Sequence, residues 1–111
     1  MYTQEQMDEL LQEEKGKLAQ ALAADPDVSA AKRSWDGATG YLEQQRHLLN
    51  SLTMDSRWTS WTPEQRRNAR LAQGEKVMAA QDAVKEKEEL YMRAVDGYYH
   101  RQRESAIAAA D

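Results

Sequence analysis

The stretch from Pro63 to the end of the chain constrains the fold most, because it contains no second proline and repeats one apolar spacing. One row of apolar side chains recurs every seven residues within it: Val77, Val84, Tyr91 and Tyr98. Thr62, Pro63 and Gln65 have the order of a helix cap, a first-turn proline and a side chain that returns to the cap. We therefore expect one helix over about residues 62–109, which at about 1.5 Å per residue would be about 70 Å long.

The amino-acid composition argues against a β-sheet. Apolar residues make up 41% of the 111 residues, but most of them are alanine and leucine, and phenylalanine is absent. Strands depend on β-branched and aromatic side chains on a pleated face, whereas alanine, leucine, glutamine, glutamate, lysine and arginine are strong helix formers. We therefore expect an all-α protein.

Two shorter helices are expected before the long one. Thr3 and Gln6 have the spacing of a capping box at the start of the first. Asp25 and Pro26 end that helix, because a proline disfavours helical geometry in the residue before it. The same two residues can begin the second helix, with the aspartate as its cap and the proline in its first turn.

The second helix carries a heptad-like seam that would keep facing one partner helix. Its two rows are Val28, Trp35, Leu42 and Leu49, and Ala31, Ala38, Gln45 and Leu52. Gly37 and Gly40 lie between these positions, and each costs about 1 kcal/mol relative to alanine inside a helix. They would either bend the helix or let another backbone come close. Because the heptad phase is unchanged across them, we expect one continuous helix.

These patterns predict a single all-α domain over residues 1–111, an elongated helical hairpin or bundle with coiled-coil-like packing and a long C-terminal helix. Its three helices would cover about residues 3–24, 26–53 and 62–109. The long helix would break near Gly74 or Gly97, or be covered by the two shorter helices placed nearly end to end, or pack its tyrosine-rich end on another chain. The last two arrangements leave apolar surface for neighbours, so we expect an oligomer.

Charge and hydropathy restrict the partners and the location. The net charge is −4, but residues 1–31 carry seven acids against two lysines, which makes a poor surface for a nucleic-acid backbone. No apolar run approaches the roughly 20 residues that cross a bilayer. The N-terminus is acidic and lacks the features of a signal peptide. We expect protein partners, no membrane contact, and a cytoplasmic or virion location.

Cysteine is absent, which excludes disulfides and thiolate metal sites.

The sequence contains none of the common catalytic motifs, such as a G-x-S-x-G turn, a glycine-rich phosphate loop after a strand, or H-E-x-x-H. Each histidine has a carboxylate four residues before it: Glu43 precedes His47, and Asp96 precedes His100. Two ligands do not make a metal site, and such pairs usually belong to a solvated helix face. We therefore expect no catalytic, cofactor-binding or metal-binding residue and no enzyme activity.

Tryptophan, tyrosine and arginine are the candidate interface residues, because these types dominate interface hot spots or suit surfaces that assembly buries. The candidates are Arg57, Trp58, Trp61, Arg66, Arg67, Arg70, Tyr91, Tyr98 and Tyr99. The loop tryptophans either cap the end of the hairpin or anchor a partner, and the tyrosines lie either in the core or at an interface.

The three arginines lie at the start of the third helix, where the helix dipole disfavours positive charge. They are either solvated or meet acids. Those acids would come from the N-terminal helix of a neighbouring subunit or from nucleic acid, although three arginines do not make a DNA-binding stripe in an acidic protein.

The tripeptide Trp35-Asp36-Gly37, in a cysteine-free helical chain of this length, resembles the WXG100 family of small secreted helical hairpins. The resemblance implies that this tripeptide forms the turn between two helices. The chain departs from the family pattern at Pro26, which interrupts what would be the first helix. The family's C-terminal Tyr-x-x-x-Asp/Glu element is also missing, because the residues at that spacing are Val95, Gln102 and Arg103.

The function expected from these features is a non-enzymatic helical subunit for protein–protein interaction and assembly. It would be a small structural or adaptor component of a larger phage virion or bacterial complex, and it would assemble with copies of itself or with that complex. The alternative is a small acidic regulator or inhibitor that binds a single host protein through its first helix. A secreted WXG-like hairpin is a further alternative, which would turn at Gly37 rather than within residues 54–61.

Overall fold

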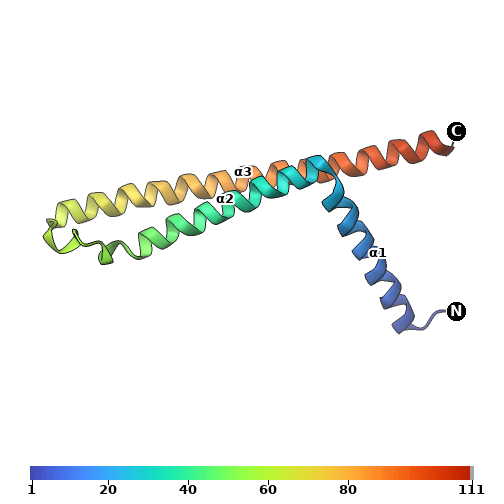
Figure 1. Cartoon of the computed structure of the whole chain (residues 1–111), viewed down its shortest axis with the longest axis horizontal. Helices are drawn as coiled ribbons and strands as arrows, with labels where there is room; N and C mark the ends of the chain where they lie inside the picture. The colour runs from blue at the N-terminus through green and yellow to red at the C-terminus, as the bar shows by residue number, and fades with distance from the viewer. Residues whose placement is uncertain (111) are drawn as a thin grey trace. The chain divides into compact units, whose positions relative to one another are not determined.

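A computed structural model describes residues 1–110 of the chain (Figure 1). These residues form the helices α1 (Gln4–Ala24), α2 (Pro26–Asn50) and α3 (Pro63–Ala110). Two short 3-10 turns, η1 (Leu52–Met54) and η2 (Trp58–Ser60), lie between α2 and α3. No strand occurs in this part of the chain, so the expected all-α fold is confirmed.

Capping side chains set the helix boundaries where the sequence predicts them. The Thr3 hydroxyl accepts the backbone N–H of Gln6 at 3.1 Å, and the Gln6 side chain accepts the backbone N–H of Thr3 at 3.0 Å. Asp25 has extended backbone geometry, and its carboxylate accepts a backbone N–H in the first turn of α2 at 3.1 Å. Thr62 and Gln65 form the same reciprocal pair at the start of α3. Each pair satisfies N–H groups that a helix end would otherwise leave unpaired.

The end of α2 is the one boundary that differs by more than a residue from the prediction. The helix ends at Asn50 rather than near residue 53. Ser51 donates its hydroxyl hydrogen to the carbonyl of His47 at 2.8 Å, and the chain then winds more tightly as η1. Such side-chain bonds to the backbone compete with helix continuation.

Glycines interrupt neither of the long helices. α2 continues through Gly37 and Gly40, and α3 continues through Gly74 and Gly97. Nothing lies within 4 Å of the position that a Cβ would take at Gly37 or Gly40, so no other backbone approaches α2 there. Trp35-Asp36-Gly37 therefore lies inside a helix, and the turn implied by the resemblance to the WXG100 family is not formed at that position.

The chain divides into two compact units. One contains residues 33–90, that is, most of α2, the loop and the first part of α3. The other contains residues 1–32 and the part of α3 that begins at Tyr91. α2 and α3 each contribute to both units.

In the unit of residues 33–90, α2 and α3 pack through the predicted apolar rows. Its core consists of buried Leu42, Val77 and Ala80, with half-buried Leu49 and Val84 against them. Gln45 is buried in the same seam, and Gln73 donates to its backbone carbonyl at 3.0 Å and to its side-chain oxygen at 2.9 Å. This pair satisfies an amide that would be costly to bury alone.

In the other unit, the start of α2 meets the last part of α3. Val28 is buried, and Tyr91 and Tyr98 are half-buried. The Lys32 ammonium lies 5.7 Å from the centroid of the Tyr91 ring, within the range of a cation–π contact. The residues of the predicted heptad rows are therefore buried or half-buried in both units.

Charged side chains add a second link in this unit. Arg101 pairs with Asp25 at 2.9 Å and with Asp27 at 3.5 Å. The pKa of Asp25 is lowered, chiefly by the hydrogen bond from the backbone N–H of Val28 and further by Arg101, while burial opposes the shift. The same carboxylate therefore caps α2 and holds α3.

Helix α1 contains no buried residue, and residues 1–20 are all exposed. We define its apolar stripe as Met7, Leu10, Leu11 and Leu18. Each of these residues is 40–57% exposed. Most helices in proteins depend on the packing of such a face rather than on intrinsic propensity. α1 thus has the apolar stripe of a packed helix without the packing.

Candidate protein-interaction surface

The loop between α2 and α3 is organised by Asp55. Its carboxylate accepts three hydrogen bonds from Arg57, from the backbone N–H at 2.8 Å, from Nε at 3.1 Å and from Nη2 at 2.9 Å. The side-chain hydrogen bond from Arg57 is the largest cause of a pKa of about 2 at Asp55. The same contact raises the pKa of Arg57. This ion pair fixes the chain immediately before the two tryptophans.

Trp58 and Trp61 fold back onto arginine side chains. Their rings meet edge to face, with centroids 6.2 Å apart. The guanidinium carbons of Arg66 and Arg70 each lie 5.1 Å from the Trp58 centroid, and that of Arg57 lies 5.1 Å from the Trp61 centroid. Arg66 also donates from Nε to the Trp58 carbonyl at 2.9 Å. Both tryptophans are half-buried, so they close the end of the hairpin and still present part of their surface.

The arginines at the start of α3 border a concave, positively charged surface. A hollow of about 340 Å³ is lined by Trp58, Pro63, Arg66, Arg67 and Arg70. Within residues 1–110, no acidic side chain forms an ion pair with any of these three arginines. The helix dipole adds partial positive charge at this end of α3. Such a concavity suits an oxyanion, because guanidinium groups bind carboxylates and phosphates with paired hydrogen bonds. We call Arg66, Arg67 and Arg70 the arginine cluster.

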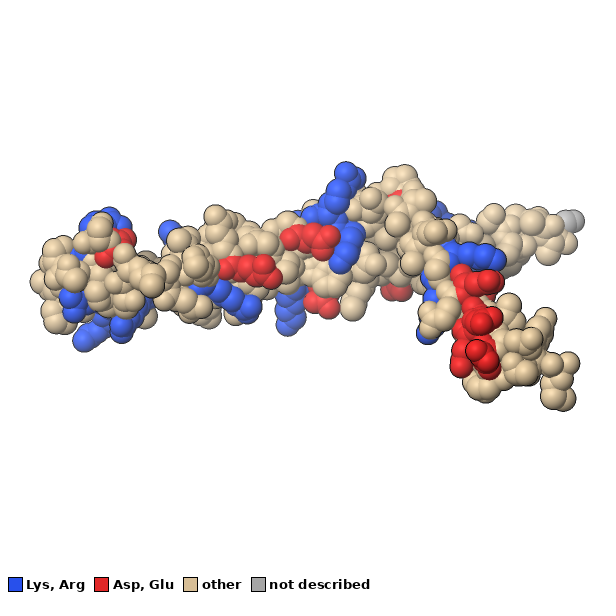
Figure 2. Space-filling view, turned by 60° about the horizontal axis from the view of Figure 1, so that its bottom comes forward, with Lys and Arg blue, Asp and Glu red and all other residues tan. Residues whose placement is uncertain are grey.

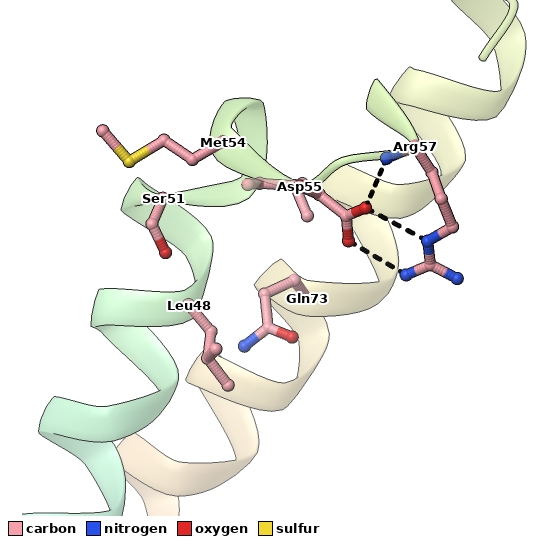
Figure 3. A pocket seen from close by; sticks show the side chains of 7 residues that line it. Leu48, Ser51, Met54, Asp55, Arg57 and Gln73 are labelled. Carbon is pink, nitrogen blue, oxygen red and sulfur yellow. Dashed lines mark hydrogen bonds and ion pairs between the residues drawn. The ribbon is translucent and has the colours of Figure 1, made fainter. Parts of the chain in front are cut away.

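A second hollow lies on the α2 side of the loop (Figure 3). It has a volume of about 420 Å³ and is lined by Leu48, Ser51, Leu52, Met54, Asp55, Arg57 and Gln73. Met54 extends outward and is 84% exposed, while Gln73 reaches from α3 toward α2. The mouth of this hollow therefore combines a flexible apolar side chain with the Asp55–Arg57 ion pair, a mixture typical of protein contact surfaces.

The nine predicted interface residues fall into two groups. The arginines and tryptophans come together at the loop, as described above, whereas the three tyrosines lie in the other unit. Tyr98 and Tyr99 meet edge to face with centroids 5.7 Å apart, and Tyr99 is the more exposed of the two. Tyr91 packs against Lys32. The heptad row explains the partial burial of Tyr91 and Tyr98, so Tyr99 keeps the most surface for a partner.

Helix α1 carries surface features that no single sequence motif marks. Its acidic row, defined here as Glu5, Asp8, Glu9 and Glu13, borders a shallow groove that Gln12 also lines. Figure 2 shows acidic side chains gathered along this helix. At 3.6 residues per turn, the acidic row and the apolar stripe occupy opposite faces of α1. The helical spacing of Met7, Leu11 and Leu18 is typical of a packed face, and only the structure shows that this face is exposed.

No group of three or more histidine and carboxylate side chains is placed to hold a metal ion in the described part of the chain. None of its helices contains a segment apolar and long enough to cross a membrane. Comparison of the chain with protein-family models, with curated proteins and with solved structures finds no match. The chemistry of the surface therefore has to support any functional proposal.

The Asp55–Arg57 pair leads to a pH prediction. Because folding lowers the pKa of Asp55 from 3.8 to about 2, its stabilising contribution is fully present above about pH 4 and is lost as the pH falls toward 2. Titration of the Asp55 carboxyl carbon by NMR should give a midpoint near the lower value. Arg57→Gln should move that midpoint back toward 3.8 and leave Asp25 unchanged. A wild-type midpoint near 3.8 would contradict the geometry of the loop.

Proposed function

We propose that this chain is a non-enzymatic subunit that assembles with other protein chains, copies of itself among them. The observation that carries the proposal is α1, a helix of 21 residues with an apolar stripe and no buried side chain. An amphipathic helix gains most of its stability from packing that stripe. A protein partner that covers it would supply what the helix lacks in its own unit.

The surface of the hairpin supports the same proposal. Several large apolar side chains on α2, the loop and α3 are also exposed: Tyr41, Leu48, Met54, Leu71 and Met78. Single exposed apolar residues are ordinary on a monomer. Here they accompany a core of only a few small and medium-sized residues, so burial by neighbours would add substantially to the stability of the fold.

The absolute mass in solution tests this function directly. Light scattering behind a sizing column, over a wide range of protein concentration, should give a mass above that of one chain that increases with concentration. A monomer at every concentration and ionic strength would remove self-assembly from the proposal. Binding to a different protein would then be the form of the function that remains.

That second form is a small acidic regulator that binds one other protein through α1. The observation in its favour is the acidic row, whose four carboxylates form no ion pair among residues 1–110. A regulator of this kind would be a monomer alone and would form a complex of fixed stoichiometry with a basic partner. The mass measurement therefore separates the two forms before any partner is known.

A further inference from the structure

We propose that the arginine cluster is the docking site for the acidic row of α1 in a second copy of this chain. This inference rests on the proposed function and names one contact of the assembly. It joins two different surfaces of the same chain, and both surfaces carry charge that is unpaired within the described residues.

Contacts with Trp58 orient the side chains of the arginine cluster so that they can bind an oxyanion. The guanidinium carbons of Arg66 and Arg70 lie over the Trp58 ring, and Arg66 is held further by its Nε hydrogen bond to the Trp58 carbonyl. Apart from the Nε of Arg66, no N–H group of these two guanidinium groups forms a hydrogen bond within residues 1–110, and a carboxylate binds such N–H groups in the guanidinium plane. The side chains are therefore oriented before a partner arrives, which reduces the entropy lost on binding.

The geometry of the two surfaces matches. Arg66 and Arg70 stand four residues apart on α3, and Glu5 and Glu9 stand four residues apart on α1. Four residues correspond to about 6 Å along a helix axis, so two carboxylates on one helix can meet two guanidinium groups on the other in register. Arg67 and Asp8 extend the basic and the acidic surface, respectively.

Other acids of the chain are less suited to the arginine cluster. Asp25 and Asp27 pair with Arg101, Asp55 pairs with Arg57, and Glu104 pairs with His100. The acids near the middle of α3 alternate with lysines. The acidic row is the concentrated negative surface that remains, and the positive potential at the start of α3 is its electrostatic complement.

A contact between two different surfaces has a consequence for the assembly. Two chains that make the contact reciprocally form a closed dimer, whereas a single contact leaves one acidic row and one arginine cluster free, so growth continues until a larger ring closes or a filament forms. The apolar stripe lies on the opposite face of α1, so the same helix can hold a second neighbour there. The mass should therefore exceed that of one chain as concentration rises, and it should fall as salt shortens the Debye length from about 30 Å at 0.01 M to about 3 Å at 1 M.

Charge reversal on each surface tests the contact. One variant carries Glu5→Lys, Glu9→Lys and Glu13→Lys, and the other carries Arg67→Glu and Arg70→Glu. Each variant alone should have a lower mass than the wild type at the same concentration, because each has two surfaces of like charge and keeps only contacts made by the apolar stripe. An equimolar mixture should recover assembly, because each reversed surface finds its complement on the other variant. Recovery also shows that both variants fold.

The control variant Lys76→Glu/Lys85→Glu makes the same charge change on α3 outside the arginine cluster, and it should assemble like the wild type. Variants that assemble as well as the wild type, or a mixture that stays at the lower mass, would overturn the docking site and leave the proposed function standing. A wild type that is monomeric at low ionic strength would overturn both this contact and self-assembly. Reversals that change the stability of a monomeric wild type would place the contact within one chain, which also overturns the proposal.

Discussion

Replacing Leu42 by alanine should destabilise the α2–α3 hairpin by about 2–3 kcal/mol, toward the low end of the range measured for buried leucine-to-alanine changes. Leu42 is buried between α2 and α3 together with Val77 and Ala80. The half-buried Leu49 and Val84 beside it can shift into part of the space, which keeps the loss below the upper end of that range. Urea unfolding followed by far-UV circular dichroism should show a lower midpoint with an unchanged slope.

A loss of this size is large because the core is small. Folded domains of ordinary size are stable by only about 5–15 kcal/mol, and a hairpin with few buried side chains should lie near the lower limit. Leu48→Ala is the matched control, since Leu48 is on the same helix but exposed, and it should cost less than about 1 kcal/mol. Equal losses for the two variants would show that Leu42 is not the centre of the core.

The helix starts could be predicted from the sequence because their causes are local. Thr3 with Gln6 and Thr62 with Gln65 need only a spacing of three residues to form a capping box. Asp25 likewise acts through its own neighbours. The predicted end of α2, near residue 53, lies beyond the observed end at Asn50. The helix ends there because the Ser51 hydroxyl donates a hydrogen bond to the His47 carbonyl and a 3-10 turn follows.

The heptad rows predicted which face of each long helix is covered. Gln45 shows why this works even for a polar residue, because its place in the row brings it opposite Gln73, which satisfies its amide. The continuity of α2 across Gly37 and Gly40 also followed from the unchanged phase of the row. Periodicity carries this information because a helix has a fixed number of residues per turn.

The candidate surface was only partly predictable. Residue type identified the arginines and tryptophans, but the contacts between them depend on how the loop bends at Asp55, which no periodicity encodes. The predicted tyrosines, Tyr91, Tyr98 and Tyr99, lie in a different unit from the loop residues. The exposure of the α1 stripe had no counterpart in the sequence, because the spacing of a stripe is the same whether or not a partner covers it.

The double substitution Leu11→Asp/Leu18→Asp should abolish the contact that the apolar stripe of α1 makes in the assembly. Both leucines belong to the apolar stripe, and they are 57% and 40% exposed in the chain alone. Burying one leucine side chain contributes about 1.5–3 kcal/mol. About half of each leucine remains to be buried, so losing both should raise the dissociation constant of an assembly that covers the stripe by at least about tenfold. Light scattering at a concentration where the wild type is oligomeric should find a lower mass for this variant.

Gln12→Asp/Ala19→Asp is the control that separates the stripe from the added charge. It introduces two aspartates with the same spacing of seven residues and almost the same positions along α1, but on the face of the acidic row. It should assemble at least as well as the wild type, since more negative charge on that face does not weaken an attraction to arginines. If both double variants lose assembly equally, charge or helix propensity is responsible and the stripe is not an interface. If only the stripe variant loses it, the apolar face of α1 is buried in the assembly, and hydrogen exchange of the α1 amides should accelerate in that variant alone.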